Sequence, residues 1–229
     1  MEESQRLERL VGELGVVERL RQGSAALRPE SLDANSLLAE EAGRFASRAA
    51  SQGVAIEIVS DPRAGEATGA TGAAVGEGAA GAAGATAPLS FTGDRLAAER
   101  ILQNLVDNAL SVLPAGGHIW LAAAPMQLPG RPAGVSLSVT DDGPGFPPGT
   151  LSRVFERFFR ADPSRAGSGS GLGLAIVREL APAHGGEAWA ENVAPRGARV
   201  TVYLPVVPVF DRGVAADAAP DSHPGILPG

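Results

Sequence analysis

The order of helical and alternating apolar patterns constrains the fold of this chain more than any other feature. Apolar residues recur at helical spacing in three stretches, 34–50, 95–113 and 172–180, the last of which we expect to be stopped by Pro182. Strand-like runs lie between and after them, at 54–60, 89–94, 118–124, 135–141, 187–191 and 199–205, the last two as a hairpin. This order predicts an α/β fold, a two-layer sandwich of a mixed sheet with helices on one face.

Three segments fall outside this pattern. Residues 62–88 are low-complexity Gly and Ala, which bury too little surface to offset the entropy of ordering, so we expect a flexible insertion. The Pro-, Ala- and Asp-rich tail, 207–229, is expected to be disordered. Residues 4–21 carry an apolar stripe that includes Leu7 and Leu14, typical of a helix that packs on a partner helix, although an ordinary amphipathic terminal helix explains it equally well.

The composition excludes several classes of function. All 19 basic residues are Arg, and the net charge of −7 argues against a nucleic-acid partner, which needs a basic face. The absence of cysteine excludes disulfides and cysteine metal sites. No long apolar stretch and no signal-peptide pattern occur, so we expect the chain as given to be soluble.

Two asparagines stand out on the predicted helix 95–113. Asn104 and Asn108 are four residues apart, so they lie on one face, apart from the apolar stripe. A carboxamide oxygen is a neutral, hard ligand that suits Mg²⁺ when phosphates supply the negative charge. Two solvent-facing asparagines are the simpler alternative, but Asn is unfavourable in the middle of a helix, so the pair needs an explanation.

A strand that ends in an acidic, glycine-rich turn follows at 139–146, "VTDDGPGF". Gly143 and Gly145 allow a sharp turn and a close approach of the backbone to a ligand. Asp141 can only accept hydrogen bonds when ionised, so in a pocket it would select a ring that carries an amine, such as adenine, over guanine. A plain turn that terminates the strand is the alternative.

The segment "GSGSGLGLAIV", residues 167–177, resembles a phosphate site because its glycines lead directly into a helix N-terminus. Neither a Walker motif nor the dinucleotide spacing GxGxxG is present, and the chain has no lysine. The preceding residues are rich in Phe and Arg, and Arg157, Arg160 and Arg165 could pair with phosphate oxygens. The flanking glycines would let this segment move as a lid; a loop whose Phe side chains plug the edge of the core is the alternative, and both can hold in part.

Taken in order, the two asparagines, the Asp-x-Gly-x-Gly turn, the "FERF" stretch at 155–158 and the second glycine box closely resemble the catalytic ATP-binding domain of sensor histidine kinases. These kinases share a superfamily with DNA gyrase and heat-shock chaperones. The resemblance implies a dimerisation helix end at 1–31, a catalytic domain at 32–206 that holds an ATP lid at 146–170, and the tail.

The resemblance also implies a role for each motif residue, with ATP and Mg²⁺ as cofactors. Asn108 would bind Mg²⁺, with Asn104 beside the phosphates, and Asp141 would hold the adenine amine with Gly143 and Gly145 against the base. The residues that would line the triphosphate are Gly169, Gly171, Leu172 and Gly173. Relatives that hydrolyse ATP carry a Glu at the position of Asn104 as a base for water, so an Asn there favours phosphoryl transfer. Asn104, Arg157 and Arg160 are therefore the candidate catalytic residues.

Several departures from the family pattern matter. A basic residue and an aromatic usually follow the second Asn, where this chain has Ser111 and Val112, and Ala198 replaces a common Thr. None of the three histidines heads a dimerisation helix, so the acceptor His would lie on a dimerisation domain absent from this chain. The expected partners are that domain and a response regulator, in the cytoplasm, with a membrane involved only through parts of the parent protein outside this chain. A degenerate nucleotide-binding or interaction module and an anti-sigma-type serine kinase remain as alternatives.

Overall fold

The computed structural model describes residues 28–60, 89–160 and 170–206. Most of the expected dimerisation helix end, residues 1–27, lies outside these residues, as do the Gly/Ala insertion, the tail and 161–169 of the expected lid. The last residues of that expected helix end, 28–31, are described and are not helical, because Glu30 and Ser31 belong to a strand. In chain order the elements are β1 (Glu30–Asp33), α2 (Ala34–Ser51), β2 (Ala55–Val59), β3 (Ser90–Gly93), α3 (Arg95–Val112), β4 (His118–Gln127), β5 (Ala133–Asp141), α4 (Gly173–Ala183), β6 (Glu187–Asn192) and β7 (Ala198–Pro205). None of the described helices is both long and apolar enough to span a bilayer.

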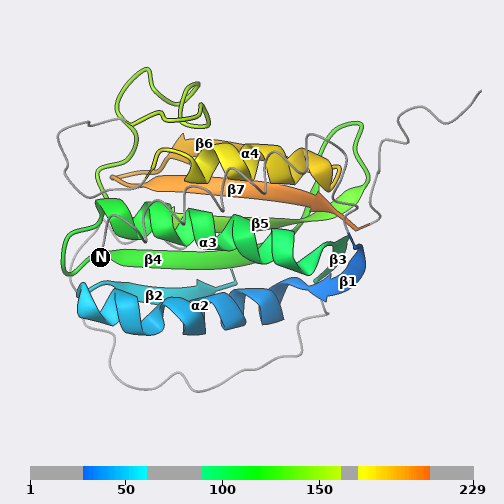
Figure 1. Cartoon of the computed structure of the whole chain (residues 1–229), viewed down its shortest axis with the longest axis horizontal. Helices are drawn as coiled ribbons and strands as arrows, with labels where there is room; N and C mark the ends of the chain where they lie inside the picture. Colours follow the sequence, from blue (N-terminus) through cyan, green and yellow to red (C-terminus); the bar gives the residue numbers. More distant parts are fainter. Residues whose placement is uncertain (1–27, 61–88, 161–169, 207–229) are drawn as a thin grey trace, which may run out of the picture.

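A five-stranded mixed sheet with the order β2-β4-β5-β7-β6 forms one layer. Only the β2–β4 pair is parallel; the other three neighbouring pairs are antiparallel. Helices α2, α3 and α4 cover one face of this sheet (Figure 1). The predicted two-layer α/β sandwich is therefore confirmed, and the bounds of its main elements agree with the sequence patterns to within a few residues.

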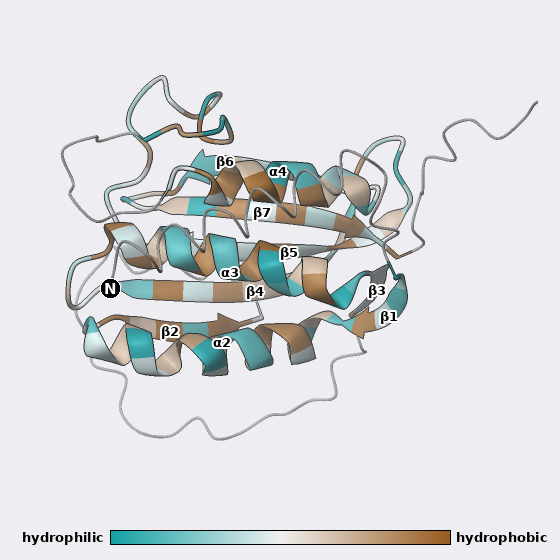
Figure 2. Ribbon diagram, viewed as in Figure 1, coloured by the Kyte–Doolittle hydropathy of each residue, from teal (hydrophilic) through white to brown (hydrophobic). Residues whose placement is uncertain are grey.

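The core lies between the sheet and the three helices. Alternate residues of β4, β5 and β7 point into it, among them Leu121, Leu137 and Val202, each with no exposed surface. In Figure 2, hydrophilic and hydrophobic segments alternate along α2 and α3, as expected for amphipathic helices with one face on the sheet. This packing fixes α3 above the centre of the sheet, next to α4.

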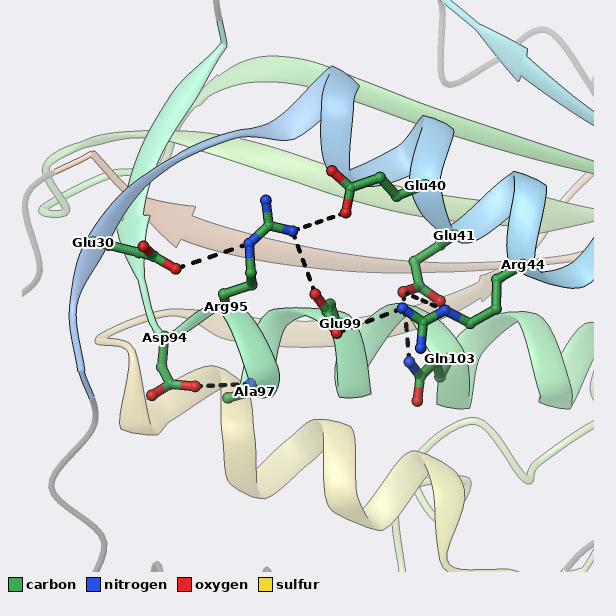
Figure 3. Close-up of polar contacts among 9 residues, drawn as sticks. All are labelled: Glu30, Glu40, Glu41, Arg44, Asp94, Arg95, Ala97, Glu99 and Gln103. Carbon is green, nitrogen blue, oxygen red and sulfur yellow. Dashed lines mark hydrogen bonds and ion pairs between the residues drawn. The ribbon is translucent and has the colours of Figure 1, made fainter.

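Side-chain caps and a polar network fix the start of α3 and its position against α2. The Asp94 carboxylate accepts a hydrogen bond of 3.0 Å from the N–H of Ala97, which caps the first turn of α3. Arg95 then pairs with Glu40 of α2 at 2.8 Å and with Glu99 of its own helix at 3.3 Å (Figure 3). These contacts join the two helices at the end where each of them begins.

Deeper in the same interface, Glu41 of α2 is fully buried against Gln103 and Arg44 (Figure 3). Burial raises the pKa of the Glu41 carboxyl, and Arg44 only partly opposes this effect. The interface therefore holds a buried acidic group whose pKa lies above its ordinary value, which was not apparent from the sequence.

Two features differ from the sequence prediction. The four-residue strand β1, which pairs antiparallel with β3 beside the main sheet, was not predicted. The prediction that Pro182 stops the last helix was wrong, because α4 continues to Ala183 with this proline in its last turn. A proline there removes only one helical hydrogen bond, and the carbonyls of Ala181 and Pro182 accept bonds from His184, Gly185 and Gly186 beyond the helix.

Candidate nucleotide-binding site

The two asparagines of α3 lie on the side of this helix that faces the start of α4. Asn104 is 7% exposed, and its Nδ2 donates a 2.7 Å hydrogen bond to the Arg100 carbonyl, which leaves Oδ1 directed away from its own helix. A Cβ built on Gly173, the first residue of α4, would lie 3.1 Å from this Oδ1. Asn108 is half-buried one turn further along α3. The carboxamide oxygen of Asn104 therefore reaches the helix N-terminus that the second glycine box precedes.

Asp141 ends the central strand β5 and is 4% exposed. Its Oδ1 accepts a 2.9 Å hydrogen bond from the N–H of Gly143. Burial raises the pKa of the Asp141 carboxyl to about 6, from an ordinary 3.8; the N–H groups of Gly143 and Ala198 lower it, and the nearby Asp142 raises it. A desolvated carboxylate at the end of a strand is suited to binding a hydrogen-bond donor from a ligand.

The conformation of the first glycine box leaves no room for a side chain at either of its glycines. A Cβ on Gly143 would lie 2.7 Å from Asp141 Oδ1, so a larger residue there would displace the carboxylate. Gly145 has a φ of +74°, and its Cβ would lie 2.9 Å from Asn192 Oδ1 and from the Gly197 carbonyl. Asn192 contacts this turn from β6, and no sequence pattern had indicated it.

The second glycine box connects the expected lid to α4. Gly171 has a φ of +71°, and a Cβ on it would lie 2.9 Å from the backbone of Phe158, whose N–H donates a 2.9 Å hydrogen bond to the Gly171 carbonyl. Leu172 is buried and caps α4 without a side-chain hydrogen bond. The first N–H groups of α4 thus have no side-chain cap, a geometry that suits an anion. Gly169 lies outside the described residues.

The three Phe side chains of the expected lid occupy different environments. Phe155 is buried in the core, and Phe159 packs partly against it with the Arg153 guanidinium 5.0 Å from its ring centre. Phe158 is 63% exposed and has a positive φ of 61°, which is unusual for a residue other than glycine. The prediction of Phe side chains at the edge of the core is therefore correct for two of the three.

The arginines proposed to contact phosphate are only partly described. Arg157 forms a 3.1 Å ion pair with Glu179, a residue of α4. Arg160 is half-buried, and Arg165 lies outside the described residues. In this conformation Arg157 thus ties the lid to α4, and to bind a phosphate it would have to leave Glu179.

The structure brings most of the sequence-predicted residues to one end of the molecule. The β5 strand end with Asp141, the glycine turn and the loop at 142–160 lie at the end of the sheet where α4 begins (Figure 1). Helix α3 packs beside α4 and brings the asparagines to the same region.

Ser111 is exposed in the last turn of α3, and its hydroxyl donates to the Asn108 carbonyl at 2.7 Å. Within the described residues, no group of three His, Asp or Glu side chains is placed to hold a metal ion.

The histidines in the described residues have structural environments. His184 is 1% exposed; its Nδ1 lies 2.8 Å from the Leu180 carbonyl, and its Nε2 accepts a hydrogen bond from the N–H of Asp94. His118 stacks on Trp120 with ring centres 5.7 Å apart. His223, in the tail, lies outside the described residues.

Comparison with known proteins confirms the family that the motifs resemble. A model of the family described as "Histidine kinase-, DNA gyrase B-, and HSP90-like ATPase" matches residues 93–208, just over half of the chain. The signal transduction histidine-protein kinase/phosphatase MprB of Mycolicibacterium paratuberculosis is 42% identical over 110 residues, which are 48% of this chain and 20% of that protein. This chain spans about a fifth of the length of the curated relatives it matches.

Solved structures agree with the sequence relatives. The structure of the mycobacterial sensor histidine kinase MprB matches with a TM-score of 0.58 and 28% identity, over 78% of this chain and 99% of that one. The structure of full-length ShkA in complex with AMPPNP matches with a TM-score of 0.67 and 26% identity, over 91% of this chain and 38% of that one. The chain therefore belongs to the histidine kinase-, DNA gyrase B- and HSP90-like ATPases, and its relatives group it with the catalytic ATP-binding domains of sensor histidine kinases.

Proposed function

We propose that this chain binds Mg-ATP and transfers the γ-phosphoryl group to a histidine on a dimerisation domain outside it. The observation that carries the proposal is the buried Asp141 carboxylate at the end of β5, beside a glycine turn. The N-terminus of α4 lies at the same end of the sheet. The similar ShkA structure is a complex with AMPPNP, which is consistent with an adenine nucleotide at this site.

Each part of the nucleotide has a matching group in this arrangement. Asp141 would accept a hydrogen bond from the exocyclic amine of adenine, and the uncapped N–H groups of α4 would donate to phosphate oxygens. Asn104 and Asn108 would orient the metal-bound phosphates through their carboxamide oxygens. Bound Mg²⁺ would supply charge neutralisation at the phosphates.

The chemistry that follows is phosphoryl transfer. The acceptor imidazole nitrogen attacks the γ-phosphorus, an N–P bond forms, the bond from phosphorus to the bridging oxygen breaks, and ADP leaves. Asn104 cannot act as a base for water, so hydrolysis has no general base at this position. We propose a response regulator as the partner that receives the phosphoryl group next, and a cytoplasmic location for this domain.

One observation favours a second candidate, a module that binds a nucleotide weakly or not at all. Ser111 stands where the family usually has a basic residue, and Arg157 is paired with Glu179. Because the last turn of α3 carries neither arginine nor lysine, it would lack one basic contact to the phosphates. This module would share the fold and the buried Asp141 but would not transfer phosphate.

Calorimetric titration with ATP, ADP and GTP, with and without Mg²⁺, tests the proposal. We expect binding of the adenine nucleotides only, a loss of affinity of about a hundredfold in Asp141→Asn, and loss of the Mg²⁺ effect in Asn108→Ala. Asp142→Asn is the matched control, because Asp142 pairs with the N–H of His118 in β4, at 2.8 Å. No binding at millimolar ATP would instead favour the inactive module.

Transfer itself requires the missing partner. Labelled phosphate should move from ATP to a dimerisation domain supplied in trans, and a His→Ala change of its acceptor should abolish the transfer. Binding of ATP without transfer to any such domain would contradict the kinase part of the proposal.

A further inference from the structure

Asn192, the last residue of β6, makes a two-way contact with the start of the expected lid. Its Oδ1 accepts a 2.7 Å hydrogen bond from the N–H of Phe146, and its Nδ2 donates a 2.8 Å hydrogen bond to the carbonyl of the same residue. The two residues are 46 positions apart in the chain. Because a carboxamide has one acceptor end and one donor end, this pair of bonds fixes both the position and the orientation of the Phe146 peptide groups.

The glycines around this contact form a close-packed corner. A Cβ on Gly145 would lie 2.9 Å from Asn192 Oδ1, so the turn approaches the carboxamide as closely as a glycine allows. Gly197, in the turn between β6 and β7, has a φ of +123°, and a Cβ on it would overlap the carbonyl oxygen of Asp141. The end of β6, the turn after it and the end of β5 therefore meet at one point.

We propose that Asn192 is a positioning residue of the nucleotide site, which holds the Gly145–Phe146 turn at a fixed distance from the Asp141 carboxylate. The inference rests on the proposed function, because the turn and the carboxylate are the two sides between which the base would lie. Asn192 acts through the Phe146 backbone and needs no contact with the ligand. The same contact anchors Phe146, the first residue of the expected lid, and Phe158, further along the described part of this segment, is bonded to Gly171.

The physical reason for such an anchor lies in the composition of the loop. Gly143 and Gly145 lose more conformational freedom on ordering than other residues, so an unanchored turn would sample many positions relative to Asp141. A turn that is fixed before the ligand arrives avoids this loss on binding. Asn192 is exposed, so its hydrogen bonds contribute little to the stability of the whole domain. Its removal should therefore affect nucleotide affinity more than folding.

The test compares Asn192→Ala with Gln127→Ala in the full chain, by calorimetry with ATP and ADP and by urea unfolding without a nucleotide. Gln127 is the matched control, because its carboxamide also binds turn carbonyls, those of Leu128 and Arg131, but at the opposite end of β4 from His118 and the site. We expect Asn192→Ala to weaken ATP and ADP by the same factor, about tenfold, with the Mg²⁺ effect retained. Both variants should unfold at similar urea concentrations, and Gln127→Ala should bind ATP as the unchanged chain does.

Asn192→Asp is a second variant, since it keeps the acceptor for the Phe146 N–H but places a carboxylate oxygen against the Phe146 carbonyl. Its ATP affinity should therefore also fall below that of the unchanged chain. Suppose that the unchanged chain binds ATP and that Asp141→Asn abolishes the binding. An unchanged ATP affinity of Asn192→Ala would then overturn this inference and leave the proposed function standing. Equal losses of affinity in Asn192→Ala and Gln127→Ala would also overturn it, and failure of the unchanged chain to bind ATP would overturn the proposed function with it.

Discussion

At the scale of single residues, the burial of Asp141, which we propose binds the adenine amine, lowers the stability of the folded protein at neutral pH. Burial raises the pKa of its carboxyl from 3.8 to about 6, so the ionised form is less favourable in the folded protein than in the unfolded chain. A pKa that is higher in the folded state means that the folded protein binds the proton more tightly than the unfolded chain. The shift corresponds to a destabilisation of about 3 kcal/mol above pH 6, which disappears as the pH falls below 4.

This sign leads to a prediction for the protein without nucleotide. Asp141→Asn should be more stable than the unchanged chain at pH 7.5, because it removes a buried charge while keeping an acceptor for the Gly143 N–H. The difference in free energy of unfolding should shrink as the pH falls from 7.5 to 4.5, since the unchanged chain then takes up the proton. Urea unfolding at several pH values measures this difference. A gap that stays constant or widens on acidification would contradict the assignment to Asp141.

At the scale of elements, α3 carries both the asparagines and the largest departure from the family pattern. Its last turn contains no basic residue, and the exposed Ser111 only donates to the Asn108 carbonyl. A cation there would face the negative end of the helix dipole and the region where we place the phosphates. The cap and the apolar face of α3 therefore agree with the family pattern, while its last turn lacks the basic residue that the proposed phosphate site would use.

Ser111→Arg should restore this contribution. We expect ATP affinity to rise by about three- to tenfold, and the gain to decline with added salt, because it depends on a charge near the surface. Ser111→Gln is the control, since it adds a long polar side chain without the charge. Calorimetry at low and high salt separates the two variants, and an equal effect of Arg and Gln would show that charge is not what this position lacks.

At the scale of the whole molecule, the sequence predicted the two layers well because the apolar residues of each main element recur at helical or alternating spacing. Helix α3 was predicted as 95–113 and is observed as Arg95–Val112. Strand β1 was missed because only one of its four residues, Leu32, is buried, too few to give an alternating pattern. The motif residues could be found from their spacing, whereas Asn192 could not, because its partner is set by how β6 and the loop after β5 meet in space. Similarly, nothing local to Arg157 indicates that it pairs with Glu179 of α4.

The connection between β2 and β3 gives a test at this scale. Residues 62–88 are expected to be a flexible insertion, so a Gly/Ser linker of half their length should leave ATP affinity unchanged. The free energy of unfolding should rise by about 0.6 kcal/mol, the loop-closure difference for a twofold change in length. Urea unfolding and calorimetry measure both quantities. A loss of several kcal/mol would show that this segment packs on the domain.

The position of β2 at one margin of the sheet has a consequence for how such a chain can diverge. β2 and α2 lie before the part that the family model covers, and the strands that meet at the candidate site, β5, β6 and β7, occupy the middle and the far side of the sheet. No residue of β2 takes part in the contacts of Gly197 with Asp141 or of Asn192 with Phe146, so we expect substitutions in β2 and length changes directly after it to leave these contacts in place. This side of the domain can therefore vary in sequence and length with little effect on the proposed nucleotide site.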